Sequence, residues 1–269
     1  MIDFNINSLF NIDFFSWVKD VFFPFVRILA LIMVAPIFGE KEVLNRTKIG
    51  LALVIVMLLP LPHLDENIKT YSLTGIWIIA QQIMIGVLIG FTMQLAFITV
   101  RIAGELIGMQ MGLGMATFFD PVGGPSTSVL SRLINIIALL IFLSLDGHLW
   151  LLYGISNSFD IVPIRLMSLP APANGYLSLI EISNQLFING IMLALPLMTL
   201  LLIINISLGL LNRITPQLSI FVVGYPLTLL LGLIMLSYLI SMLPTFTEFI
   251  FEQMFNHISV ILWFLSDVQ

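Results

Sequence analysis

The sequence predicts an all-α membrane-associated protein with about six long helices arranged in hairpins. Hydrophobic residues make up 59% of the 269 residues and charged residues 9%, whereas a soluble domain has about 45–50% apolar and about 25% charged residues. The apolar residues gather in long runs, and a helix that crosses a bilayer needs about 20 such residues. The connectors between the runs are short, so we expect no separate soluble domain.

Several classes of protein are excluded by composition. The chain has no cysteine, which excludes disulfides and thiolate metal sites. The three histidines lie far apart and no HExxH motif occurs, so no metal site is predicted. The net charge of −5 does not indicate the basic surface that nucleic-acid-binding proteins use. No nucleophile with a matching base and no phosphate-binding loop is found, so we expect neither an enzyme nor a cofactor.

The first half of the chain contains three predicted spans, at residues 18–38, 49–64 and 75–100. The second span is short because Pro60 and Pro62 remove amide donors and stop the helix. An aromatic, acidic stretch precedes the first span, and we expect it to lie at an interface.

The second half begins with a predicted span over residues 129–155, in which Asp146-Gly147-His148 marks a helix end. Prolines and an Asn-Gly pair then predict a break over residues 156–179. Two spans at 181–211 and 217–243 are separated by only a few residues, which predicts an antiparallel helical hairpin. A separate amphipathic helix is expected over the tail, 245–269.

Residues 101–132 are the most unusual stretch, because they combine six glycines with charged groups and methionines between apolar spans. Non-helical backbone at membrane depth survives only inside protein or along a water-filled path. Methionine is adaptable, and glycine weakens a helix by about 1 kcal/mol. These features suit a seal for a pore, and close helix packing is an equally good interpretation. The candidate sealing residues are Gly108, Met109, Met111, Gly112, Leu113, Gly114, Met115, Phe118 and Phe119.

Ionisable groups within apolar spans are costly and indicate paired or functional positions. The spacing of Arg101 and Glu105 predicts an ion pair on one helical face. Asp120 precedes a proline and is expected to cap a turn. An alternative function remains open, a small-solute or ion transporter that works alone with Arg27, Glu105 and Asp120. The structural charges are Arg27, Arg101, Glu105, Asp120 and Arg132.

Three motifs together resemble one known family. They are GELIGMQMGLGMATFFDPVGG, LSRLINIIALLIFLSLDGHLWLL and GLLNRITPQLSIFVVGYPLTLLLGL. These motifs resemble the FliR/SctT family of type III export-gate proteins, and their residues are most similar to those of its flagellar branch. The resemblance extends over nearly the whole chain.

The resemblance implies a FliP-like helical part over residues 1–175 and a FliQ-like hairpin with a C-terminal helix over 176–269. Such a protein assembles with FliP and FliQ, beside FlhA and FlhB, in the bacterial inner membrane at the flagellar basal body. The resulting gate is partly raised above the bilayer plane and passes unfolded flagellar substrates. The loop that matches residues 106–122 plugs the closed channel. No cofactor and no nucleic acid are implied.

Overall fold

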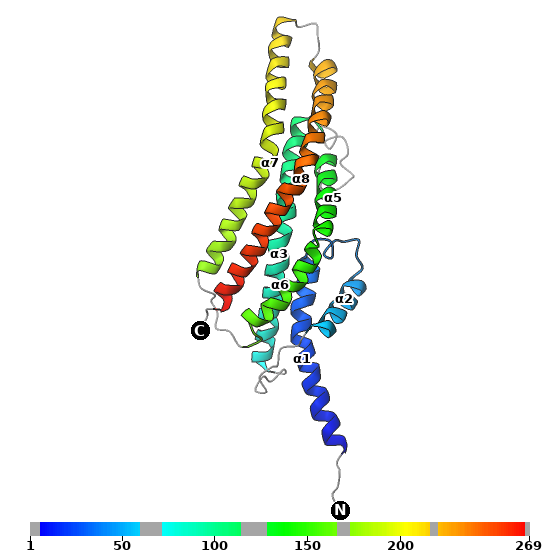
Figure 1. Ribbon diagram of the computed structural model, residues 1–269, viewed down its shortest axis with the longest axis vertical. Helices are drawn as coiled ribbons and strands as arrows, with labels where there is room; N and C mark the ends of the chain where they lie inside the picture. Colours follow the sequence, from blue (N-terminus) through cyan, green and yellow to red (C-terminus); the bar gives the residue numbers. More distant parts are fainter. Residues whose placement is uncertain (1–5, 60–71, 114–127, 166–172, 216–219, 267–269) are drawn as a thin grey trace, which may run out of the picture. The chain divides into compact units, whose positions relative to one another are not determined.

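The computed structural model describes residues 6–59, 72–113, 128–165, 173–215 and 220–266 (Figure 1). Every regular element in these ranges is an α-helix, which confirms the predicted all-α class. The helices are α1 (Ile6–Val34), α2 (Asn45–Leu58), α3 (Leu73–Gln110), α5 (Val129–Ser144), α6 (Gly147–Ile161), α7 (Ala173–Ile214) and α8 (Ile220–Ser266).

Among the described residues, fewer helices could cross a membrane than the six spans predicted. Three are long and apolar enough, namely α3, residues 180–214 of α7 and residues 224–266 of α8, and the bent pair α5–α6 would make a fourth. Helix α2 has 14 residues and rises about 21 Å, which is less than the hydrocarbon thickness of about 30 Å. The predicted span at 49–64 is therefore too short in the structure.

The predicted span at 129–155 is broken into α5 and α6. Asp146 adopts a positive φ of 55°, a conformation that aspartate tolerates better than most residues. The Phe142 ring occupies the space where a Cβ atom of Gly147 would lie. The helix end predicted at Asp146-Gly147-His148 is thus confirmed, while the continuous span across it is wrong.

Two other boundaries differ from the prediction. Helix α1 begins at Ile6, so the stretch expected at an interface is the first part of this helix. Helix α8 continues through Pro244 to Ser266, where a separate tail helix was predicted. The break expected near residues 156–179 is confirmed in position, because α6 ends at Ile161 and α7 begins at Ala173.

The chain divides into two compact units, of which the first comprises residues 1–94, 149–179 and 254–269. In this unit α1 packs against α2 and against α3, where a Cβ atom on Gly86 would overlap the Arg27 carbonyl oxygen. The end of α8 is amphipathic, as predicted. Its buried side chains recur at helical spacing, at Met254, Ile258, Ile261, Leu262 and Leu265.

The second unit comprises residues 95–148 and 180–253. Here α7 and α8 lie side by side and antiparallel (Figure 1), and Asn189 Nδ2 donates to Gln253 Oε1 at 3.2 Å. The predicted helical hairpin is therefore confirmed, and its likeness to FliQ stays a prediction. Rings from Phe97, Phe142 and Phe251 form the aromatic core, with centroids 5.1 to 5.5 Å apart.

Candidate functional site at the end of helix α3

Helix α3 ends in a glycine-dependent turn at the start of the predicted plug. Gly112 has a φ of +82°, in the left-handed region that glycine adopts without steric cost. The Gly112 amide donates to the Met109 carbonyl at 3.0 Å, and the Leu113 amide donates to the Gly108 carbonyl at 2.9 Å. These two bonds define a Schellman motif. Because α3 extends to Gln110, the predicted loop at 106–122 begins as helix.

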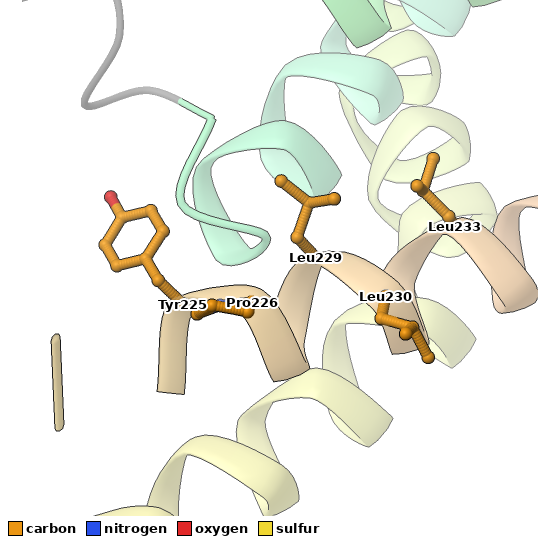
Figure 2. Close-up of a pocket in the computed structure, with 5 residues that line it drawn as sticks. All are labelled: Tyr225, Pro226, Leu229, Leu230 and Leu233. Atoms are coloured by element: carbon orange, nitrogen blue, oxygen red, sulfur yellow. The ribbon is translucent and has the colours of Figure 1, made fainter. Parts of the chain in front are cut away.

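Helix α8 holds this turn from the side. The Tyr225 hydroxyl donates to the Gly112 carbonyl oxygen at 2.8 Å, and Figure 2 shows Tyr225 and Leu229 pointing toward the last turn of α3. Met111 is fully buried and packs at Gly232, where a Cβ atom would lie 2.6 Å from the Met111 terminal methyl. The start of the predicted plug is therefore held against α8 by the Tyr225–Gly112 hydrogen bond and by packing of the Met111 side chain on Gly232.

The other side of the plug is fastened to α3 through the first turn of α5. The Glu105 carboxylate accepts a hydrogen bond from the Ser128 amide at 3.0 Å. Ser128 Oγ accepts from the Ser131 amide at 3.1 Å, which is the usual bond of a serine N-cap. Ser131 Oγ donates to the Arg101 carbonyl at 2.9 Å. Three polar contacts thus fix where α5 begins.

Glycines make this close contact possible. A Cβ atom on Gly104 would lie 2.6 Å from Ser131 Cα, and one on Gly108 would lie 2.8 Å from Ser128 Oγ. Gly108 also provides the carbonyl that accepts from Leu113. The chain on either side of segment 114–127 therefore meets at one residue of α3.

The predicted Arg101–Glu105 ion pair is not formed in the part of the chain that the structure describes. The Glu105 carboxylate instead accepts from the backbone at the start of α5. A buried amide at a helix start needs an acceptor, and Glu105 supplies it across the helix pair. The residue acts as a capping group for α5, which spacing along α3 could not show.

The remaining predicted residues fall in different places. Met109 is 54% exposed at the end of α3, Arg101 is half-buried on α3, and Arg132 is exposed on α5. The other predicted sealing and charged positions lie outside the described residues; they are Gly114, Met115, Phe118, Phe119 and Asp120.

Arg27 belongs to the first unit and is fully buried there. Its Nε donates to Gln82 Oε1 at 2.7 Å, Nη1 to the Ser158 carbonyl at 2.8 Å, and Nη2 to the Val162 carbonyl at 2.9 Å. The guanidinium also lies 4.3 Å from the centroid of the Phe159 ring. Each nitrogen of this cation is engaged in holding helices together, so the contacts do not favour the transporter alternative.

Sequence reasoning did not identify Tyr225, Gly232, Ser128 or Ser131 as parts of this site. One available signal was the four-residue spacing of Gly104, Gly108 and Gly112, which marks a helix face that neighbours approach closely. That spacing predicts a close neighbour and leaves the identity of the neighbour open.

We expect replacement of Glu105 with alanine to destabilise the protein by about 1–3 kcal/mol, because the Ser128 amide loses its acceptor. Glu105→Gln keeps a side-chain oxygen and should cost less. Thermal unfolding of the purified protein in detergent measures both. Equal losses in the two variants would show that the carboxylate charge, and not the accepted bond, is what matters.

Comparison with known proteins gives the family. A family model described as "Bacterial export proteins, family 1" matches residues 18–254. The flagellar biosynthetic protein FliR of Pectobacterium carotovorum subsp. carotovorum is 50% identical over 94% of this chain and 97% of its own length. FliR of Escherichia coli strain K12 is 46% identical over 90% of this chain and 92% of its own length.

A more distant relative matches over a similar range. FliR of Bacillus subtilis strain 168 is 29% identical over 81% of this chain and 85% of its own length. The resemblance drawn from the three motifs is confirmed by these matches. The chain belongs to family 1 of the bacterial export proteins, and the three relatives named above are flagellar FliR proteins.

Proposed function

We propose that this chain is a core subunit of the flagellar type III protein export gate in the bacterial inner membrane, at the basal body. In the assembled gate, segment 106–122 closes the channel through which unfolded flagellar substrates leave. The family, the FliR relatives and the apolar helices support a membrane component of this apparatus. The observation that supports the plug is that Leu113 and Ser128, the described residues on either side of segment 114–127, both contact Gly108.

A plug has to be anchored at its base while its middle part yields to a substrate. Both anchors are present here, since Leu113 bonds to Gly108 and Ser128 bonds to Glu105. Loops whose ends lie close together are compact and commonly functional. The glycines and the methionine between the anchors suit a seal that closes tightly and deforms reversibly.

Partner subunits are proposed from the exposed surface of the hairpin. We compared an apolar 18-residue stretch of each long helix. Within the chain, 61% of this stretch is buried in α3, compared with 22% in α7 and 28% in α8. Asn205 is exposed within the α7 span, and an amide facing hydrocarbon without a partner is costly. We infer that helices of FliP and FliQ cover this hairpin. FlhA and FlhB are placed beside the gate by the resemblance alone.

An in-frame deletion strain tests the proposed function. We expect flagellin and hook protein to disappear from the culture medium of the deletion strain and to return when a plasmid supplies the gene. The energy for export would come from the partners, since the sequence has no nucleotide-binding motif. Normal export in the deletion strain would overturn the proposal.

Deletion of residues 109–115 is expected to make the assembled gate conduct ions while FliP and FliQ still co-purify with the chain. The deletion removes Met111 and Gly112, which fasten the segment to α8. Ion uptake by membrane vesicles measures the leak, and co-purification controls for assembly. Unchanged conductance in an assembled gate would contradict the plug.

A further inference from the structure

The connector between α1 and α2, residues 35–44, breaks two local rules of backbone structure (Figure 1). Ile37 has a φ of 71°, which is a genuine outlier for a β-branched residue. Leu44 occupies the N-cap position of α2 and makes no side-chain bond to the helix, where serine, threonine, aspartate and asparagine are strongly preferred. Positions at which a folded chain departs from its local rules are expected to be functional or strained.

The need to reverse the chain direction does not explain these two residues. Glycine adopts a positive φ without steric cost, so a glycine would make the turn at position 37 more easily than isoleucine. A polar residue at position 44 would satisfy an amide at the start of α2. Strain of this kind persists only where the surrounding structure determines the conformation. The contacts around the connector therefore show what it is held for.

The connector is held in one conformation by contacts within the first unit. Lys48 is buried, with 6% of its surface exposed, and its Nζ donates to the carbonyls of Gly39 and Glu40, each at 3.0 Å. The Gly39 amide donates to the Ala35 carbonyl at 2.8 Å. A Cβ atom on Gly39 would lie 2.7 Å from the same carbonyl oxygen, so the turn packs tightly on the end of α1.

The role of the buried Lys48 ammonium is confined to this connector. Burying a charged group is costly unless it is paired or hydrogen-bonded, and no carboxylate is bonded to Lys48 in the part of the chain that the structure describes. Its two acceptors are backbone carbonyls of the connector, beyond the end of α1 at Val34. The contacts of this cation thus determine the shape of the connector.

The outward side of the connector has charges of both signs around one apolar side chain. We define the connector surface as Glu40, Lys41, Glu42, Leu44 and Arg46, which are all exposed, Leu44 to 67%. Protein–protein interfaces have an apolar centre and a polar rim. An anionic lipid surface instead attracts clusters of lysine and arginine, whereas here two carboxylates balance two cations. The chemistry of this surface therefore fits a protein better than a membrane.

We propose that the connector surface is a preformed binding site for another protein subunit of the export apparatus, and that Lys48 is the positioning residue that holds it in its binding shape. The naming of the apparatus rests on the proposed function. Leu44 is the central contact, and the partner places an apolar side chain against it, with charged groups of both signs around this contact. A loop that is already ordered loses little conformational freedom on binding, which is what the Lys48 bonds provide.

Photo-cross-linking from position 44 tests the binding site. Leu44 is replaced by the photoreactive amino acid p-benzoylphenylalanine in the full chain, which a plasmid supplies to the deletion strain. We expect irradiation of the cells to join position 44 to FliP, FliQ, FlhA or FlhB, each recognised by its own antibody. Cross-links to lipid alone, or to a second copy of this chain, would overturn the binding site.

Variants of Lys48 test its positioning role with the same probe. Lys48→Met should lower the cross-link yield per folded chain about tenfold, because a hydrogen bond to a charged group stabilises one conformation by about that factor. Lys48→Arg keeps a cation that can donate to both carbonyls and should restore most of the yield. Equal yields in Lys48→Met and its parent would show that Lys48 does not position the connector.

Gly86→Ala is the control for general loss of stability. Gly86 lies in the first unit, away from the connector, and a Cβ atom there would overlap α1, so this variant disturbs the packing of the unit without removing a connector bond. Its cross-link yield per folded chain should equal that of the parent. A loss in Gly86→Ala as large as that in Lys48→Met would show that general destabilisation, and not the shape of the connector, lowers the yield.

Export in the deletion strain separates this inference from the proposed function. If export is lost in the deletion strain and position 44 gives no cross-link to the four subunits, the connector inference fails while the proposed function stands. If a cross-link that depends on Lys48 forms and the deletion strain exports normally, the proposed function fails while the connector surface stands.

Discussion

Arg27→Met is expected to destabilise the chain by about 3 kcal/mol, because each lost hydrogen bond to a charged group contributes about 1.5–3 kcal/mol and removal of the buried charge offsets part of the loss. In this variant Gln82 Oε1 and the Val162 carbonyl no longer accept a hydrogen bond from Arg27. Buried acceptors that lose their partner keep the full cost of desolvation.

The position of Arg27 explains how a buried cation is tolerated without a carboxylate beside it in the described part of the chain. Ser158 lies in the last turn of α6, and its carbonyl accepts from both Val162 N and Arg27 Nη1. The carbonyls that end a helix carry partial negative charge, which stabilises a cation there. Arg27 thus caps α6 and ties α1 to it, and Gln82 adds α3 to the same cluster.

Arg27→Lys should lose about half as much stability, since an ammonium keeps the charge and lacks the planar fork with which Arg27 reaches four acceptor atoms at once. Arg46→Met is the matched control, because Arg46 is exposed on α2 and exposed substitutions stay within about 0.5 kcal/mol. Thermal unfolding of the chain purified in detergent compares the variants. Similar stability of Arg27→Met and Arg46→Met would contradict this role.

The sequence predicted those features that depend on residues close together along the chain. Runs of apolar residues gave the helices, the short connection near residue 214 gave the α7–α8 hairpin, and glycine with methionine marked the end of α3. Contacts between distant residues could not be predicted in this way. Tyr225 is 113 positions from Gly112, and Ser158 is 131 positions from Arg27.

Local rules also gave wrong answers where a distant group competed. The four-residue spacing of Arg101 and Glu105 predicted an ion pair. The Glu105 carboxylate instead accepts a hydrogen bond from the Ser128 amide. A separate tail helix was predicted over 245–269, and α8 continues through Pro244 to Ser266. In each case packing against another element outweighed the local preference, as it does for helix propensity in general.

The close contact of α1 with α3 predicts a second large effect, at Gly86. Here a Cβ atom would overlap the Arg27 carbonyl oxygen and lie 2.9 Å from the Ala30 Cβ. Backbone atoms cannot move aside as a flexible side chain can, so Gly86→Ala should cost about 1–3 kcal/mol through overpacking. Gly86→Leu should prevent the two helices from packing and remove the protein from the membrane fraction.

Gly154→Ala is the matched control, since Gly154 lies inside α6 and a Cβ atom there would meet nothing within 4 Å. Alanine is favoured over glycine in a helix by about 1 kcal/mol, so this variant should be slightly more stable than the parent. Replacement of glycine by alanine is thus expected to lower stability at Gly86 and to raise it at Gly154. Unfolding temperatures that fall in both variants would show that loss of glycine flexibility, and not the approach of α1 to Gly86, limits stability.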